Sequence, residues 1–166
     1  IFTNTKFLNS NADALDSDFS EGILENCEFV NSGNDAIDTS GSTVEIINVK
    51  VINSSDKGIS SGENSNLNIT NSLFKNNAIA LVVKDGSKLS VFESKVQSND
   101  LDLAVFIKKD FYSNQLNFYS DFVIEKISYL IDNQVDINTN IKSNLIKTDN
   151  VINLMYGNKY GKESIR

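Results

Sequence analysis

The chain has no histidine, no proline, one cysteine and a single arginine, Arg166, at its last position. Histidine is the side chain that most readily supplies a base near neutral pH, and arginine is a cation that proteins often fix beside a carboxylate. Few ways then remain to place a near-neutral base beside a fixed cation, as proton abstraction next to a sugar carboxylate requires. Cys27 has no second cysteine with which to form an internal disulfide.

The net charge of -7 at pH 7 makes the chain acidic. An acidic surface repels phosphate backbones and anionic lipids, so we expect neither nucleic acid nor an anionic membrane surface as a partner. No apolar stretch is long enough to cross a bilayer, and the sequence shows no signal peptide. Because the chain starts inside a repeat at Ile1, we expect it to be the C-terminal piece of a longer protein, with attached domains and any secretion signal upstream.

From Ile1 to about Val105 the sequence repeats itself roughly every 22 residues. The clearest marker is the pattern Asn-x-x-(Phe/Val)-x-Asn, with a degenerate last copy at Glu93, Val96 and Ser98. The full copies are Asn4/Phe7/Asn9, Asn26/Phe29/Asn31, Asn48/Val51/Asn53 and Asn71/Phe74/Asn76. A fixed period of this length is typical of a solenoid, in which each repeat packs only on its neighbours.

Apolar and polar residues alternate within each repeat, as in Val44-Glu45-Ile46, which predicts short strands with one buried face. The expected inward columns are Phe7/Phe29/Val51/Phe74/Val96, Leu15/Ile37/Ile59/Leu81 and Ile23/Val44/Leu67/Leu89. The repeats lack both the helical i, i+3, i+4, i+7 pattern and the regular leucines of leucine-rich repeats. The sequence therefore predicts an all-β fold, a right-handed parallel β-helix of about five coils.

The repeated asparagines form two columns, which begin at Asn4 and Asn9. A side-chain amide at a turn can donate to the amide of one neighbouring coil and accept from the other, so we interpret both columns as parts of the scaffold. Cys27 lies in a column of small residues that points the same way as the Phe29 column, and we expect it to be buried.

The repeat is lost after about Phe106. An open last coil would expose its core and its unpaired strand edge. We therefore expect residues 1–105 to form the coils and residues 106–166 to form an irregular C-terminal cap, with one short helix within residues 121–130.

The units containing residues 34–38 (Asn-Asp-Ala-Ile-Asp) and residues 57–59 (Lys-Gly-Ile) lead to a Gly/Ser turn and then to Val-x-Ile or Leu-x-Ile. They resemble the parallel β-helix repeats of the pectin-lyase-like superfamily. That superfamily includes polysaccharide lyases, glycoside hydrolases, epimerases, phage tailspikes, adhesins and inert stalks, so the resemblance implies a fold and no single activity. The order of an Asn-rich β-helix, Lys108-Lys109 and a Tyr-Gly-bearing tail is also similar to C-terminal modules of large secreted bacterial surface proteins.

Two copies of an Asp-Ala-(Leu/Ile)-Asp tetrad lie one repeat apart, so stacked coils would bring their carboxylates together. Four close carboxylates could hold Ca²⁺ or contain an acid/base pair. The candidate metal ligands are Asp13, Asp16, Asp35 and Asp38. The alternative is a solvated charge ladder, because the next coil carries Lys57 after Asp35 and Ser60 after Asp38. Calcium is the one cofactor that we consider, and we assign no catalytic residue.

The pattern of the remaining lysines indicates a structural role and not a catalytic one. Lys6, Glu28 and Lys50 share an outward column and predict a surface salt ladder. Lys57, Lys84 and Lys88 are the other lysines that could neutralise a substrate carboxylate, but nothing in the sequence converges on them.

Our leading hypothesis is a non-catalytic β-helix module of an extracellular or cell-surface protein, a stalk, spacer or binding face for polysaccharide or surface glycan. The alternative is the C-terminal part of a polysaccharide-active enzyme (lyase, hydrolase or epimerase). An ice or mineral binder is disfavoured because the outward columns mix Lys, Glu and Leu73.

Overall fold

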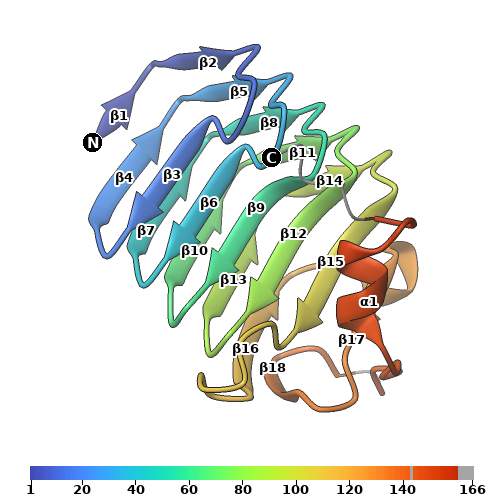
Figure 1. Ribbon diagram of the computed structural model, residues 1–166. Coiled ribbons are helices and arrows are strands. Elements are labelled where there is room, and N and C mark those ends of the chain that lie inside the picture. The colour runs from blue at the N-terminus through green and yellow to red at the C-terminus, as the bar shows by residue number, and fades with distance from the viewer. Residues whose placement is uncertain (143, 161–166) are drawn as a thin grey trace.

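A computed structural model describes residues 1–142 and 144–160 as a parallel β-solenoid of about six coils (Figure 1). Each coil contributes one strand to each of up to three sheets, and strands from successive coils pair in parallel. The predicted all-β solenoid is therefore confirmed, with about six coils where five were expected.

The three sheets differ in length. Sheet A contains β1 (Phe2–Thr3), β4 (Glu21–Glu25), β7 (Thr43–Ile47), β10 (Asn66–Thr70), β13 (Lys88–Phe92), β16 (Gln115–Ser120) and β18 (Asp136–Thr139). Sheet B contains β2 (Lys6–Leu8), β5 (Glu28–Val30), β8 (Lys50–Ile52), β11 (Leu73–Lys75) and β14 (Lys95–Gln97). Sheet C contains β3 (Leu15–Asp18), β6 (Ile37–Ser40), β9 (Lys57–Gly62), β12 (Ile79–Lys84), β15 (Leu101–Phe106) and β17 (Tyr129–Ile131).

Two of the predicted columns form the core between the sheets. Phe29, Val51 and Phe74 pair in register and are fully buried, and so are Ile37, Ile59 and Leu81. Their neighbours in the first and last coils, Phe7, Leu15 and Val96, are half-buried and pack on the same cluster. Cys27 is fully buried, as expected.

The third predicted column is wrong at its first member. Gly22, not Ile23, pairs with Val44, so Ile23 pairs with Glu45 and is 38% exposed. Leu24 instead enters the core beside Ile46. The prediction chose the apolar residue nearest the expected position, and a shift of one residue in a strand moves the side chain to the opposite face.

Both asparagine columns occupy turns with left-handed backbone. Their φ angles lie between 51° and 64°, and Glu93 and Ser98 at the degenerate copy share this conformation. Asparagine tolerates it because its short side chain bonds locally. The amides stack as predicted: Asn48 Nδ2 donates to Asn26 Oδ1 over 2.6 Å, and Asn53 Nδ2 donates to Asn31 Oδ1 over 2.7 Å.

Beyond residue 105, β16 and β18 extend sheet A and β17 extends sheet C. A single 3-10 turn, η1 (Ile124–Lys126), stands in the segment where one short helix was expected. Helix α1 (Val151–Tyr156) lies against the C-terminal end of sheet C (Figure 1). Residues 143 and 161–166 of the expected cap lie outside the described residues. In the part of the chain that is described, no helix is long and apolar enough to span a membrane.

Truncating the aromatic column tests this register. Phe29→Ala and Phe74→Ala should each lower the free energy of unfolding by about 3–5 kcal/mol, because each removes a fully buried ring and leaves a cavity. Phe111→Ala is the matched control, since its ring is 76% exposed. Urea denaturation followed by circular dichroism gives the three values. Equal losses in the three variants would show that the column does not face the core.

Candidate functional site

The outward face of sheet C changes character along the solenoid. One row across the strands runs from Asp16 through Asp38 and Ser60 to Val82 and Ala104. The row begins acidic, becomes polar and ends apolar. The apolar end, with Ile79, Leu101 and Phe106, packs under Val151 and Met155 of α1. Helix α1 therefore removes half of this face from water and leaves the charged side chains at the edge of a covered surface.

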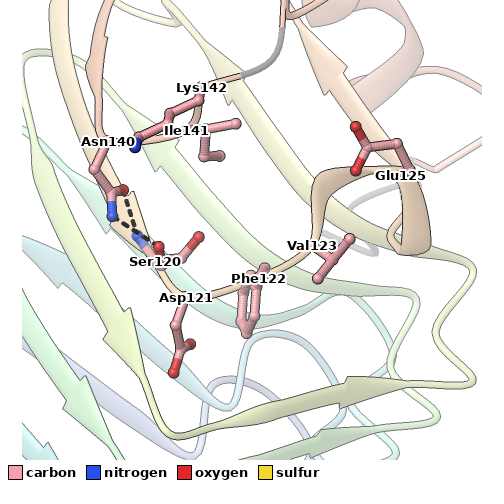
Figure 2. A pocket seen from close by; sticks show the side chains of 8 residues that line it. All are labelled: Ser120, Asp121, Phe122, Val123, Glu125, Asn140, Ile141 and Lys142. Carbon is pink, nitrogen blue, oxygen red and sulfur yellow. Dashed lines mark hydrogen bonds between the residues drawn. The ribbon is translucent and has the colours of Figure 1, made fainter.

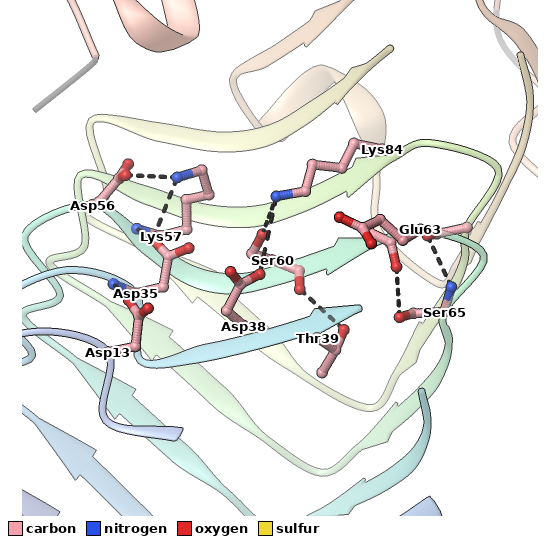
Figure 3. Close-up of polar contacts among 12 residues, drawn as sticks. Asp13, Asp35, Asp38, Thr39, Asp56, Lys57, Ser60, Glu63, Ser65 and Lys84 are labelled. Carbon is pink, nitrogen blue, oxygen red and sulfur yellow. Dashed lines mark hydrogen bonds and ion pairs between the residues drawn. The ribbon is translucent and has the colours of Figure 1, made fainter. Parts of the chain in front are cut away.

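A group of three charged side chains lies at this edge (Figure 3). Lys57 Nζ is 3.3 Å from Asp35 Oδ1 and 2.6 Å from Asp56 Oδ2. The exposed fractions of Asp35, Asp56 and Lys57 are only 3%, 8% and 3%. Asp35 Oδ1 also accepts a hydrogen bond from the backbone N–H of Lys57 over 2.9 Å. We call Asp35, Asp56 and Lys57 the Lys57 triad.

The expectation of a solvated charge ladder is wrong at the Lys57 triad. Its three side chains are buried, and the ring of Tyr156 from α1 lies 5.7 Å from Lys57 Nζ. Acidic groups do converge on Lys57, contrary to the sequence interpretation. The physical reason is that α1, which returns from far along the chain, brings its aromatic side chain close to this lysine.

Burial dominates the protonation of the triad. Desolvation raises the pKa of Asp35 to about 7, because the attraction of Lys57 only partly offsets the loss of water and Asp56 adds repulsion. Desolvation opposes the charged form of Lys57, but Asp35 and Asp56 outweigh it and raise the lysine pKa. Burial also raises the pKa of Tyr156. Lys57 is therefore a cation beside two carboxyl groups, of which Asp35 is only partly ionised near neutral pH.

A second lysine, Lys84, extends along the same face (Figure 3). Its Nζ donates to Ser60 Oγ over 2.8 Å and lies 3.9 Å from Asp38 Oδ1. Gly62 leaves room for this side chain, since a Cβ there would come within 2.6 Å of Lys84 Cε. Lys108 lies next to this group, with its Nζ 4.9 Å from the Tyr156 ring centre. Desolvation, then the charges of Lys84 and Lys57, lower the pKa of Lys108.

The structure brings the predicted aspartates together in two different settings. Asp16 pairs with Asp38, and Asp13 Oδ1 accepts hydrogen bonds from the Asp35 N–H and from Asn34 Nδ2. Partial burial, then Asp18, Asp38 and Asp13, raise the pKa of Asp16. Within residues 1–142 and 144–160, no group of three or more His, Cys, Asp or Glu side chains is placed to hold a metal ion. The calcium hypothesis stays a prediction.

The surface salt ladder has the predicted composition. Glu28 lies 2.8 Å from Lys6 Nζ and 3.0 Å from Lys50 Nζ. These hydrogen bonds lower the pKa of Glu28. Both lysines are more than half exposed, so the ladder contributes little to stability.

Two hollows lie beyond the last strand of sheet B, and Figure 2 shows the one lined by residues 120–123, 125 and 140–142. Among the described residues β14 is the last strand of sheet B, and residues 121–127 follow where a further strand would lie. Two open hollows of about 340 and 350 Å³ flank this segment. Their lining mixes apolar side chains such as Phe122 and Val123 with the charged Asp121 and Lys142. Asp121 Oδ2 caps the backbone N–H of Glu93, so this carboxylate serves the scaffold.

Asp56 and the covered part of sheet C were not predicted from the sequence. A signal for the cover was present, because β12 and β15 carry uninterrupted apolar runs at residues 79–83 and 103–106, where strands with one buried face alternate. Asp56 directly precedes β9, and no apolar run or repeated residue in the sequence indicates that it is buried.

Parallel strands in three sheets, with asparagine ladders at the turns, define the class of protein as a parallel β-helix. The family model described as "Right handed beta helix region" matches residues 1–123, and the chain belongs to that family. No curated protein and no solved structure matches the chain.

Removing the cation of the Lys57 triad should destabilise the fold. Lys57→Met should cost about 3–5 kcal/mol of unfolding free energy, because it leaves buried carboxyl groups without a partner. Without the attraction of Lys57 the pKa of Asp35 should rise above its wild-type value of about 7, so the folded variant holds a proton that the folded wild type releases. The loss should therefore grow as the pH rises through about 7. Lys50→Met, at an exposed ion pair, should change stability far less. Urea denaturation at several pH values measures both, and equal losses at all pH values would contradict this account.

Calcium titration tests the four aspartates as a metal site. A cation bound only by the folded chain must raise its melting temperature. The metal hypothesis requires a rise with millimolar calcium that Asp16→Asn and Asp38→Asn abolish and that Asp100→Asn, an exposed control, retains. An unchanged melting temperature would remove the hypothesis.

Proposed function

We propose that this chain is a non-catalytic β-helix module of an extracellular or cell-surface protein, which acts as a rigid spacer and presents a face for polysaccharide or surface glycan. The observation that carries the proposal is the state of the outward face of sheet C. Acidic and basic side chains gather there, but they are neutralised by one another and part of the face is closed by α1.

A catalytic base must be reached by its substrate. Asp35 and Lys57, the most strongly perturbed pair on this face, are each 3% exposed and lie near Tyr156. Lys84 is 7% exposed and is bonded to Ser60. Their charges stabilise one another and leave little for a substrate. This arrangement supports a structural role for the charges.

A solenoid is also well suited to a spacer. Each coil adds about 4.8 Å along the axis, so six coils span roughly 29 Å. The asparagine ladders and the continuous core couple each coil to the next, which makes the rod stiff. The exposed acidic row of Asp16 and Asp18, with the net charge of -7, favours a neutral glycan over an acidic one as ligand.

The second candidate is the C-terminal part of a polysaccharide-active enzyme. One observation favours it: Lys108 is exposed, its pKa is lowered, and it lies by Tyr156 with Asp38 and Lys84 among the charges that act on it. A lysine with a lowered pKa can act as a base, and a second lysine can neutralise a sugar carboxylate.

Activity assays separate the two candidates. The chain should show no turnover when it is incubated with a panel of neutral and acidic polysaccharides. New reducing ends report hydrolysis, unsaturated uronates report elimination, and NMR in heavy water reports epimerisation by proton exchange. Turnover that is lost in Lys108→Met, Asp35→Asn or Asp38→Asn, and kept in Lys6→Met, would overturn the non-catalytic proposal.

A further inference from the structure

The Lys57 triad combines an amine, an acyl group and a proton acceptor in one buried site. Lys57 Nζ contacts a carboxyl oxygen of Asp35 at 3.3 Å and one of Asp56 at 2.6 Å. The second oxygen of Asp56, Oδ1, is buried and has no hydrogen-bond partner in the part of the chain that the structure describes. A buried carboxylate oxygen without a hydrogen-bond partner is costly, and that cost falls when the group takes up a proton and becomes neutral.

We propose that Lys57 and Asp35 condense to a side-chain amide, an intramolecular isopeptide bond, and that Asp56 accepts the proton that activates the lysine. The bond would join Asp35, two residues before β6, to Lys57, the first residue of β9, in adjacent coils. It would therefore act as a covalent staple along the axis of the solenoid. The inference does not depend on the proposed function.

The reaction balances with the groups that are present. Asp56 carboxylate takes one proton from the Lys57 ammonium, and the neutral Nζ attacks the side-chain carbonyl carbon of the protonated Asp35. The new C–N bond forms, and the C–OH bond of Asp35 breaks. The leaving hydroxyl takes a second proton from nitrogen and departs as water. The products are a neutral secondary amide, one water molecule and protonated Asp56.

The geometry distinguishes the acyl partner from the base. Asp35 lies in the neighbouring coil, and its Oδ1 accepts hydrogen bonds from both the backbone N–H and the Nζ of Lys57. The backbone N–H stabilises the negative charge that develops on the oxygen when Nζ attacks, and the Nζ contact brings the nucleophile to the carboxyl group. Asp56 is adjacent to Lys57 in sequence, so an amide between them would close a medium-sized ring that has to hold two planar amides, which is strained. It makes the shorter contact to Nζ, which suits a proton acceptor.

The protonation of Asp35 also fits its role. Burial raises the pKa of Asp35 to about 7, so near neutral pH part of this carboxyl group carries the hydroxyl that leaves as water. The raised pKa of Lys57 favours its ammonium form, so Asp56 has to remove a proton before the nitrogen can attack. The charged groups that act on Asp35 are Lys57, Asp56 and Asp38, and Tyr156 lies over the lysine.

The surroundings favour condensation over hydrolysis. Groups held in contact react with effective concentrations of about 10⁵–10⁸ M in well-oriented systems. The amide replaces a buried ammonium and carboxyl group, whose desolvation is unfavourable, with a neutral group. Tyr156 lies over the lysine and the Asp35 and Lys57 side chains are almost inaccessible, so water is largely excluded.

Lys84 serves as an internal comparison. It is also buried, but its nearest carboxylate oxygen is 3.9 Å away and its Nζ hydrogen bond goes to the hydroxyl of Ser60. Among the residues that the structure describes, no second carboxylate forms an ion pair with it. We expect Lys84 to remain a free amine.

Intact mass spectrometry of the folded 166-residue chain, kept at neutral pH, tests the proposal. The expected mass is that of the sequence less one water molecule. Protease digestion should yield a branched peptide that joins the segments around Asp35 and Lys57. Lys57→Arg, which keeps a cation in the triad, and Asp56→Asn, which removes the base, should keep the full sequence mass while circular dichroism shows a folded β-solenoid. Lys84→Met should still lose water.

Two results would overturn the proposal. The first is a folded wild-type chain with the full sequence mass after prolonged incubation. The second is a water loss that persists in Lys57→Arg or maps elsewhere. The Asp85-Gly86 step is the chemically plausible alternative, because an aspartate before glycine can cyclise to a succinimide with loss of water. Hydroxylamine cleaves a succinimide and leaves an isopeptide bond intact, so treatment before mass measurement distinguishes the two.

Discussion

The repeated stacking of one coil on the next, about 4.8 Å apart, is the constraint on which the structure depends. It forces each side chain to lie against its equivalent above and below. Apolar columns satisfy the constraint by close packing, as in Phe7 and Phe29, whose rings stack with centres 4.4 Å apart. Amide columns satisfy it because a primary amide donates on one side and accepts on the other. Charged columns satisfy it only when the sign alternates, as in the ladder through Glu28.

Where like charges stack, the same constraint perturbs protonation. Asp16 lies beside Asp38, and partial burial, then the charges of Asp18 and Asp38, raise the pKa of Asp16. In the next row Asp35 lies beside Lys57, but water is largely absent and a third charge, Asp56, enters from the preceding turn. Stacking geometry and dehydration together concentrate the unusual chemistry of this chain on the outward face of sheet C.

Helix α1 determines which part of that face is dehydrated. Its Val151 and Met155 pack on the outside of β12 and β15, so both faces of these strands are buried. This accounts for the uninterrupted apolar runs, which a strand with one wet face would not have. It also explains why a lysine can persist at 3% exposure, since the surrounding carboxyl groups were removed from water with it.

The sequence by itself determined the period, the strand class, two of the inward columns and the asparagine ladders, because all of these depend on interactions that repeat between equivalent positions. It failed at Ile23, where a glycine occupies the inward position and hydrophobicity alone misplaces the register by one residue. Only the tertiary structure decided the state of the aspartate and lysine side chains. Their burial depends on α1, which lies about 95 residues further along the chain from Lys57, and on Asp56, whose charge is not repeated at Asn34 and Ala78 one coil away. Repeated contacts are encoded locally and can be recognised from spacing, whereas a contact made once between distant segments leaves no period to detect.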